Sequence, residues 1–400
     1  MQQVVPPMSH ELHPQARALV RALPASKIRA LANAGFGDTG QLVFWFGESD
    51  QVTPDYIRDA AIRALAEGRT FYTHNNGNSE LRAEIASYLS RLGRRSRSAD
   101  EITVTSSGVS ALMVAMQAIV DPGDRVIVVT PVWPNVAEIP RVLSAEVVRV
   151  PLTPAAGGWD LDIGRLLQAI TPETRLVVIN SPGNPTGWVM TAPQQREVLE
   201  HCRRLGVWLL CDDVYERLTL DADVVMAPSF LDLAQPDDRV LGTNSFSKAW
   251  LMTGWRLGWI VAPAAMEADL GKLIEFNTSC APDFVQAAGL AAIRSGEPYV
   301  ARLRTQLATR RDLLLDALRD LEGVQAPVPL GGMYAFFRIE GLDDSVALAA
   351  DLLRTTGLGL APGAAFGPEG EGWLRWCFAA ELQPLQDGIG RLQQWLYDRG

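Results

Sequence analysis

The sequence predicts an α/β protein, with a large domain built on a mostly parallel seven-stranded sheet flanked by helices and a smaller α+β domain. Short runs rich in β-branched apolar residues recur between residues 101 and 262. They do not alternate with polar residues, which is typical of strands buried on both faces. Segments with helical spacing of apolar residues separate several of these runs, as expected when helices connect parallel strands. A chain of 400 residues is also long enough for two domains.

Seven runs are the predicted strands of the large sheet: EITVT (101–105), RVIVVT (125–130), EVVRV (146–150), RLVVIN (175–180), VWLLCDD (207–213), RVLGTNS (239–245) and RLGWIVA (256–262). Helix signals surround them. Thr53 and Ser79 are expected to cap two helices that precede the first strand. Thr191 and Gly206 are expected to delimit a helix between the fourth and fifth strands.

The order of these signals predicts the domain organisation. Residues 51–285 contain the sheet and form the large domain. Residues 286–400 carry a long helical stretch and two further strand candidates, GGMYAFFRIE and WLRWCFA, so they form the small domain. Residues 1–50 have no signal for the large sheet and are expected to pack with the small domain.

Composition limits the possible functions. The net charge of -10 argues against binding to nucleic acid or to an anionic membrane surface. No apolar run reaches the length of a membrane span, and the N-terminus lacks the pattern of a signal peptide. Four scattered cysteines and four histidines without ligand spacing predict reduced thiols, a cytoplasmic location and no metal site.

Polar residues cluster where the predicted strands end, which is where ligands bind in open parallel sheets. Singly, each of these residues has an ordinary structural use as a turn, a cap or part of the core. Together they offer a small-residue turn that opens a helix and suits an anion, a flat aromatic ring, an amide, a carboxylate near a phenol, and a cluster of hydroxyls with an amine and a guanidinium. These groups suit a flat phosphorylated heterocycle that requires an amine nucleophile, and pyridoxal 5'-phosphate fits each of them. The residues are Ser107, Gly108, Trp133, Asn180, Asp212, Tyr215, Ser245, Ser247, Lys248 and Arg256.

The motifs SPGNPTG, CDDVYE and SFSKAWLMTGWRLGW occur in the order and with the spacing of one family. The chain resembles the class I/II aminotransferases, which are pyridoxal-phosphate enzymes of fold type I, from FGESDQVTP to WLRWCFA. The resemblance implies that Lys248 forms the aldimine with the cofactor and moves the substrate proton. It implies that Asp212 pairs with the pyridine nitrogen and that Tyr215 binds the phenolic oxygen together with Asn180.

The resemblance assigns further contacts. Trp133 would stack on the ring. The phosphate would be held by Ser107, Gly108, Val109, Ser245, Ser247 and Arg256. Position 109 departs from many relatives, because a valine offers only its backbone N–H where they have a hydroxyl.

The substrate contacts are also implied by the resemblance. Arg375 would clamp the substrate α-carboxylate, with Gly47, Asn180 and Trp133 beside it. Tyr72 would reach the phosphate of the neighbouring subunit, which predicts a homodimer with shared active sites.

The resemblance predicts a ping-pong transaminase acting on an amino acid and a 2-oxo acid. Apolar Val109 and the absence of arginine from FNTSCAPDF favour a neutral amino donor, and the aromatic residues Phe36, Phe44, Trp45 and Phe46 favour a hydrophobic or aromatic one. Core packing is the alternative use of these aromatic residues. A lyase, cyclase or synthase on the same scaffold, for example a carbon–sulfur β-lyase, stays an alternative. A ligand-sensing regulator is disfavoured, because only about fifty residues precede the matching region.

Overall fold

A computed structural model describes residues 15–34, 40–155 and 157–399. Its largest element is a seven-stranded sheet in which only β10 runs antiparallel to its neighbours. The strands in spatial order are β2 (Ile102–Thr105), β10 (Gly258–Val261), β9 (Val240–Ser245), β8 (Trp208–Asp212), β7 (Thr174–Asn180), β3 (Arg125–Thr130) and β4 (Glu146–Pro151). All seven predicted strands are present, so the predicted fold class is confirmed.

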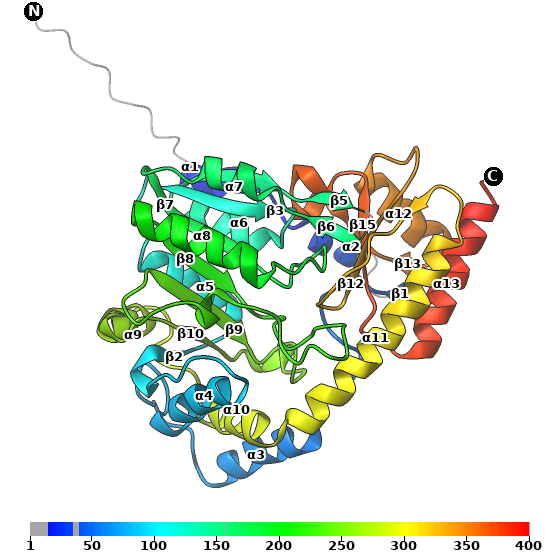
Figure 1. Ribbon diagram of the computed structural model, residues 1–400. Coiled ribbons are helices and arrows are strands. Elements are labelled where there is room, and N and C mark those ends of the chain that lie inside the picture. The colour runs from blue at the N-terminus through cyan, green and yellow to red at the C-terminus, as the bar shows by residue number, and fades with distance from the viewer. Residues whose placement is uncertain (1–14, 35–39, 156, 400) are drawn as a thin grey trace, which may run out of the picture.

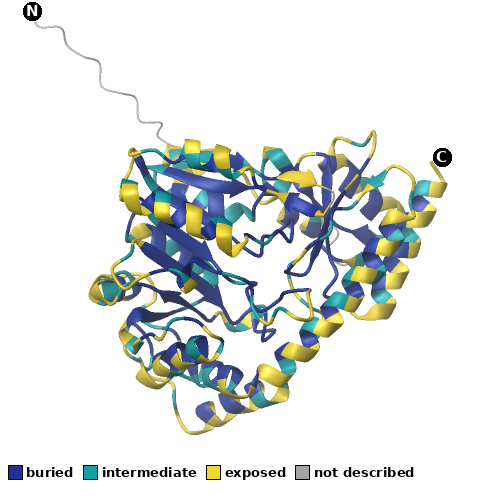
Figure 2. Cartoon of the chain, in the orientation of Figure 1, coloured by how far each residue is buried: buried dark blue, intermediate teal, exposed yellow. Residues whose placement is uncertain are grey.

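Both faces of this sheet are buried, as the continuous apolar runs predicted. Successive side chains of a strand point to opposite faces. Val126 and Val128 of β3 therefore belong to one apolar cluster, and Ile127 and Val129 to another. The strands are dark blue through the middle of the molecule in Figure 2, whereas the covering helices are striped with exposed residues.

Eight helices cover the sheet or pack beside it within the described residues (Figure 1). They are α3 (Asp55–Ala66), α4 (Ser79–Arg91), α5 (Gly108–Gln117), α6 (Pro134–Val142), α7 (Ile163–Ala169), α8 (Ala192–Leu205), α9 (Glu267–Glu275) and α10 (Asp283–Ser295). The predicted limits of α8 are confirmed, because the Thr191 side chain accepts a hydrogen bond from the Gln194 N–H and Gly206 has a left-handed backbone.

Two of the predicted helix caps are wrong. The hydroxyl of Thr53 donates to the backbone oxygen of Leu251 at 2.6 Å, and Pro54 is the residue that precedes α3. Ser79 is the first helical residue of α4 rather than its cap. The Thr53 hydroxyl is used in a tertiary contact with Leu251, and the cap position of α4 is occupied by Asn78, the residue before Ser79.

A second sheet of four strands lies beside the first unit. Its order is β11 (Val324–Gln325), β12 (Tyr334–Ile339), β15 (Trp373–Cys377) and β14 (Ala361–Pro362). Three helices accompany it: α11 (Glu297–Arg319), α12 (Ser345–Thr356) and α13 (Leu382–Tyr397). The long helix α11, yellow in Figure 1, runs from α10 to this sheet and packs against α13.

The described part of residues 15–50 contacts this second unit. β1 (Leu42–Val43) pairs in parallel with β13 (Leu358–Gly359), and α2 (Lys27–Ala34) packs against β14 and α12. The shorter elements are α1 (Ala18–Ala22) and the hairpin of β5 (Thr153–Ala155) and β6 (Gly158–Asp160). The domain limits at residues 50 and 285 stay predictions.

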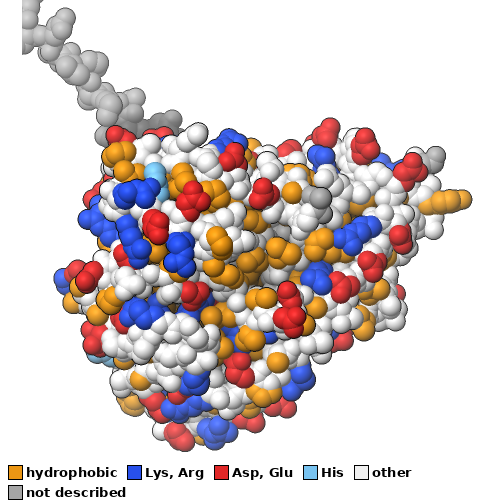
Figure 3. All heavy atoms as spheres, viewed as in Figure 1, with side chains coloured by type: hydrophobic (Ala, Val, Ile, Leu, Met, Phe, Trp, Pro, Cys, Tyr) orange, Lys and Arg blue, Asp and Glu red, His pale blue; other side chains and the backbone are white. Residues whose placement is uncertain are grey.

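The surface carries interspersed charges of both signs on the face in Figure 3. In the described ranges, no helix combines the length and apolar character that crossing a membrane requires.

Candidate functional site

The carboxyl ends of β7 and β8 bring an amide and a carboxylate together. Asn180 and Asp212 are the last residues of these strands and lie opposite each other in the sheet register. The Asn180 Nδ2 group donates to a carboxylate oxygen of Asp212 at 3.1 Å. Burial raises the pKa of Asp212 to about 7, opposed by a backbone hydrogen bond from Val214 and by the charge of Lys248. Among the described residues, no cationic side chain forms an ion pair with this carboxyl group.

The turn between β2 and α5 forms a tight approach to the end of β9. Ser107 caps α5 by accepting a hydrogen bond from the Ser110 N–H at 3.0 Å, and its φ of 132° lies in a strained region for a residue with a side chain. A Cβ atom on Gly108 would come within 2.8 Å of the Ser245 Cβ atom. The free N–H groups at this helix terminus make the turn suitable for an anion.

Three residues at and beyond the end of β9 extend this anion site. The Ser245 hydroxyl accepts from the Ser247 N–H at 3.1 Å, and the Arg256 guanidinium lies 3.5 Å from the Ser247 hydroxyl. Arg256 has a φ of 55°, and it keeps an exposed side chain. The structure thus places Gly108 against Ser245, and Ser247 against both Ser245 and Arg256, while Val109 is part-buried in the first turn of α5.

Lys248 lies in the turn after β9, and its amine donates to the backbone oxygen of Gly47. Burial lowers the pKa of this amine to about 8. Its Nζ atom also lies 5.7 Å from the centre of the Tyr215 ring. Lys248 therefore presents an amine that loses its proton far more readily than an exposed lysine.

Arg375 of β15 is a buried guanidinium with uncharged hydrogen-bond partners. It is 2% exposed, it donates to the Asn184 Oδ1 atom at 3.0 Å, and it donates to the backbone oxygen of Trp45. Its Nε group has no hydrogen-bond partner among the described residues. Buried charges are ordinarily paired, so this group suits an incoming anion.

The sequence interpretation missed two residues, Asn184 and Tyr334, that contact several of the predicted site residues. Asn184, in the loop that follows Asn180, contacts Arg375 through its side chain, and its backbone oxygen accepts from the Trp133 N–H at 2.7 Å. Tyr334, the first residue of β12, places its hydroxyl 2.6 Å from that of Tyr215. Asn184 stood inside a quoted motif, but nothing in the sequence distinguished its role from that of Asn180.

The remaining predicted residues vary in their surroundings. Trp133 precedes α6 and is partly buried. Tyr72 is 88% exposed and makes no hydrogen bond within the described part of the chain. Phe44 and Trp45 are buried in the core, and Phe46 is partly buried below the Arg29 guanidinium at 5.0 Å. Phe36 lies outside the described residues.

Known proteins resemble the chain over nearly its whole length. The family model for aminotransferase class I and II matches residues 42–387. An aspartate aminotransferase of Rhizobium meliloti is 32% identical over 88% of this chain and 88% of its own length. An arginine–pyruvate transaminase of Pseudomonas aeruginosa is 33% identical over 91% of this chain and 92% of its own length. The solved structure of an aromatic aminotransferase from Pyrococcus horikoshii has a TM-score of 0.84 at 29% identity, covering 93% of this chain and 99% of its own.

Proposed function

This chain belongs to the class I and II aminotransferase family, and we propose that it moves the amino group of a neutral, hydrophobic or aromatic L-amino acid to a 2-oxo acid. Members of the family depend on pyridoxal phosphate, and the chain is a pyridoxal-phosphate-dependent transaminase. The observation that carries an amino-acid substrate is Arg375, a buried guanidinium whose hydrogen bonds go only to uncharged oxygens among the described residues. A substrate carboxylate would be its charged partner.

The residues at the anion site fit the cofactor phosphate. The N-terminus of α5 supplies N–H groups, and Ser245 and Arg256 supply a hydroxyl and a guanidinium beside it. The Ser110 hydroxyl in the first turn of α5 is buried without a hydrogen-bond partner in the described part of the chain. An anion bound at this turn would accept from the free N–H groups and the Ser110 hydroxyl, with the Arg256 charge nearby.

The residues around Asp212 fit the cofactor ring. A carboxylate beside the pyridine nitrogen favours the protonated nitrogen, and that cation would in turn stabilise the ionised form of Asp212. Tyr215 would donate to the phenolic oxygen, and Trp133 would cover the ring face. When bound, pyridoxal phosphate supplies a ring that withdraws electrons from the substrate Cα atom.

Asn184 is better placed than Asn180 for the contacts that the sequence interpretation gave to Asn180. Both ends of the Asn180 amide are occupied inside the fold: Nδ2 donates to Asp212, and Oδ1 accepts from the Asn184 N–H at 2.9 Å. The Nδ2 group of Asn184 has no hydrogen-bond partner among the described residues, while its Oδ1 atom faces Arg375. We therefore assign Asn184 to the substrate carboxylate and the phenolic oxygen, and Asn180 to the positioning of Asp212.

Arg375 would bind the substrate, and Lys248 would transfer its proton. Arg375 and Asn184 would hold the carboxylate and so orient the Cα–H bond. An amine with a pKa near 8 exists in both protonation states near neutral pH, so Lys248 would accept the Cα proton and return it. Gly47 would hold the Lys248 amine through its backbone oxygen.

The proposed preference for neutral donors is supported by Val109, whose part-buried apolar side chain offers no partner to a second carboxylate. The similar proteins bear names with aspartate, arginine–pyruvate and aromatic specificity, so similarity does not select among donors. A panel of amino donors against several 2-oxo acids tests the proposal. Faster turnover of acidic than of neutral donors would contradict it.

A ping-pong mechanism predicts that the enzyme releases product before the acceptor arrives. Mixing the loaded enzyme with an amino acid alone is expected to yield one equivalent of 2-oxo acid per active site. Release of ammonia or thiol in place of the 2-oxo acid would favour lyase chemistry.

We also propose a homodimer in the cytoplasm. Tyr72 and Phe71 are 88% and 83% exposed in the single chain, which suits contacts with a second copy. All four cysteines are free, as in a reducing compartment. Sedimentation of the loaded enzyme is expected to give a dimer, and a monomer that keeps its cofactor would contradict the shared site.

A further inference from the structure

Tyr334 lies where the two sheets of the molecule meet. It begins β12 and is completely buried at 0% exposed. In the register of the second sheet it lies opposite Cys377 of β15, two residues from Arg375. Its side chain extends to Tyr215, which follows β8 of the large sheet, and the two rings meet edge to face with centres 5.7 Å apart.

The side chain of Tyr334 touches three residues of the candidate site. Its hydroxyl lies 2.6 Å from the Tyr215 hydroxyl. Its ring lies below the Arg375 guanidinium, 4.5 Å from ring centre to Cζ. A Cβ atom on Gly47 would come within 2.1 Å of the Tyr334 hydroxyl and 3.5 Å of the Lys248 Nζ atom, so both groups face Gly47, and the hydroxyl leaves no room for a side chain at position 47.

The two phenols have one hydrogen bond between them. Neither hydroxyl makes another hydrogen bond within the described residues. Burial raises the pKa of Tyr215 well above its usual value and also raises that of Tyr334, so both hydroxyls keep their protons at neutral pH. A phenol has a single proton to donate. If Tyr215 donates to the cofactor, Tyr334 must donate to Tyr215.

We propose that Tyr334 is a positioning residue that joins the two halves of the site: its ring supports Arg375, and its hydroxyl donates to Tyr215 and strengthens the hydrogen bond that Tyr215 donates. This inference rests on the proposed function. Hydrogen bonds in a chain polarise one another in a buried environment, so the Tyr334–Tyr215 contact reinforces the next one. The ring of Tyr334 stabilises the nearby guanidinium through a cation–π contact.

The hydroxyl and the ring of Tyr334 are expected to affect two different measurements. A stronger hydrogen bond to the phenolic oxygen stabilises negative charge on that oxygen, which favours loss of the proton from the adjacent lysine–cofactor linkage. Removal of the Tyr334 hydroxyl therefore raises the pKa of that linkage, whereas removal of the ring weakens substrate binding at Arg375. The other titratable groups that face the two phenols are Arg375, Asp212, Cys377, Glu48 and Lys248.

The first test is Tyr334→Phe, which removes the hydroxyl and keeps the ring. The pH titration of the cofactor absorption band in the loaded enzyme is expected to shift upward by at least about 0.3 pKa unit. Tyr88→Phe is the matched control, because Tyr88 is also a buried tyrosine whose hydroxyl has a hydrogen-bond partner, here Arg217, outside the site. Both variants are expected to lose thermal stability, but the control is expected to titrate like the wild type. An unshifted Tyr334→Phe titration would overturn the proposal for the hydroxyl.

The second test is Tyr334→Leu, which removes the ring as well. KM for the amino donor is expected to rise about threefold to tenfold above that of Tyr334→Phe, which itself keeps a KM near the wild-type value. Equal KM values in the two variants would overturn the role of the ring. Failure of the proposed function is recognised separately: the wild type would then bind no pyridoxal phosphate, or Lys248→Ala would leave its absorption band unchanged.

Discussion

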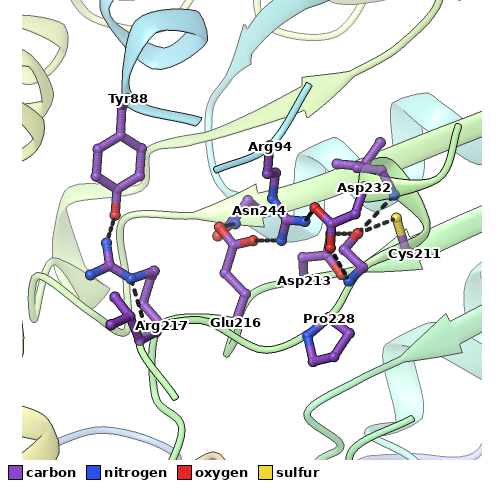
Figure 4. A network of polar contacts seen from close by, with 12 residues as sticks. Tyr88, Arg94, Cys211, Asp213, Glu216, Arg217, Pro228, Asp232 and Asn244 are labelled. Atoms are coloured by element: carbon purple, nitrogen blue, oxygen red, sulfur yellow. Dashed lines mark hydrogen bonds and ion pairs between the residues drawn. The ribbon is translucent and has the colours of Figure 1, made fainter. Parts of the chain in front are cut away.

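Two buried charged regions lie near the end of β8. In one, the buried charges pair with each other, and in the other they have no charged partner within the described part of the chain. Behind the site, the Arg94 side chain is 0% exposed and forms ion pairs with Glu216 and Asp232 (Figure 4). Glu216 also accepts a hydrogen bond from Asn244 at 2.6 Å. We call these four residues the Arg94 network. In the candidate site, by contrast, Lys248 and Arg375 donate only to uncharged oxygens within the described part of the chain.

Neighbouring aspartates show how the chain separates the two regions. The carboxylate of Asp213 accepts a hydrogen bond from the Ser229 hydroxyl at 2.6 Å, close to the Arg94 network, as Figure 4 shows. The carboxylate of Asp212 instead accepts from the Asn180 amide in the site. Successive side chains of an extended chain point in opposite directions, so one step in sequence moves a carboxylate from one region to the other. A buried charge that is paired within the fold avoids the penalty of an unpaired charge, whereas a buried charge left for a ligand carries that penalty until the ligand binds.

The comparison predicts the largest effect at Lys248. Lys248→Ala is expected to lower turnover by more than about a thousandfold, because it removes the group that moves the proton. The melting temperature is expected to stay close to that of the wild type. Lys272→Ala is the control, since Lys272 is exposed and pairs with Asp269. Retained turnover in Lys248→Ala, measured with a donor that the wild type accepts, would contradict the assigned site.

Arg375→Ala is expected to have the next largest effect. Loss of the guanidinium is expected to lower kcat/KM for an amino acid about 100-fold, as measured for buried charged contacts. The matched comparison is the corresponding amine that lacks the carboxylate, whose kcat/KM the substitution is expected to leave almost unchanged. Equal losses for both substrates would show that Arg375 supports the site without binding the carboxylate.

Substitutions in the Arg94 network are expected to lower the free energy of unfolding and to leave substrate selectivity unchanged. Arg94→Met leaves the buried Glu216 carboxylate without its cationic partner, so the free energy of unfolding is expected to fall by about 3–5 kcal/mol. Denaturant unfolding measures this loss. In the double variant with Glu216→Gln, part of the stability is expected to return, because the unpaired charge is removed. An additive or larger loss in the double variant would show that charge pairing is not the cause.

The sequence predicted the sheet, and it pointed to most residues of the candidate site, because both depend on local signals. Buried strands are continuous apolar runs, and the polar residues at their ends stand out against them, as with Asp212 after VWLLC. The sequence interpretation named Asn180 and did not consider Asn184, since the direction of each amide depends on how the loop folds against Arg375. Tyr334 was missed because a tyrosine at the start of an apolar strand resembles core, and its hydroxyl acquires a partner only where the two sheets meet. Thr53 was misjudged for a similar reason, because a distant backbone oxygen takes its hydroxyl.

The most discriminating effect is expected for Asp212→Asn in the enzyme without its cofactor. Burial holds the pKa of Asp212 at about 7 in the folded state against 3.8 ordinarily, so between these pH values the folded state keeps a proton that the unfolded state has lost. Wild-type stability therefore falls as the pH rises from about 4 to about 7, and the asparagine variant escapes this loss. The melting temperature of Asp212→Asn minus that of the wild type is expected to increase over this range and then level off. With pyridoxal phosphate added the order should reverse, because Asp212 then gains a cationic partner that asparagine cannot match. A difference that is independent of pH would show that Asp212 is not held in its protonated form, and would remove the contrast with the Arg94 network.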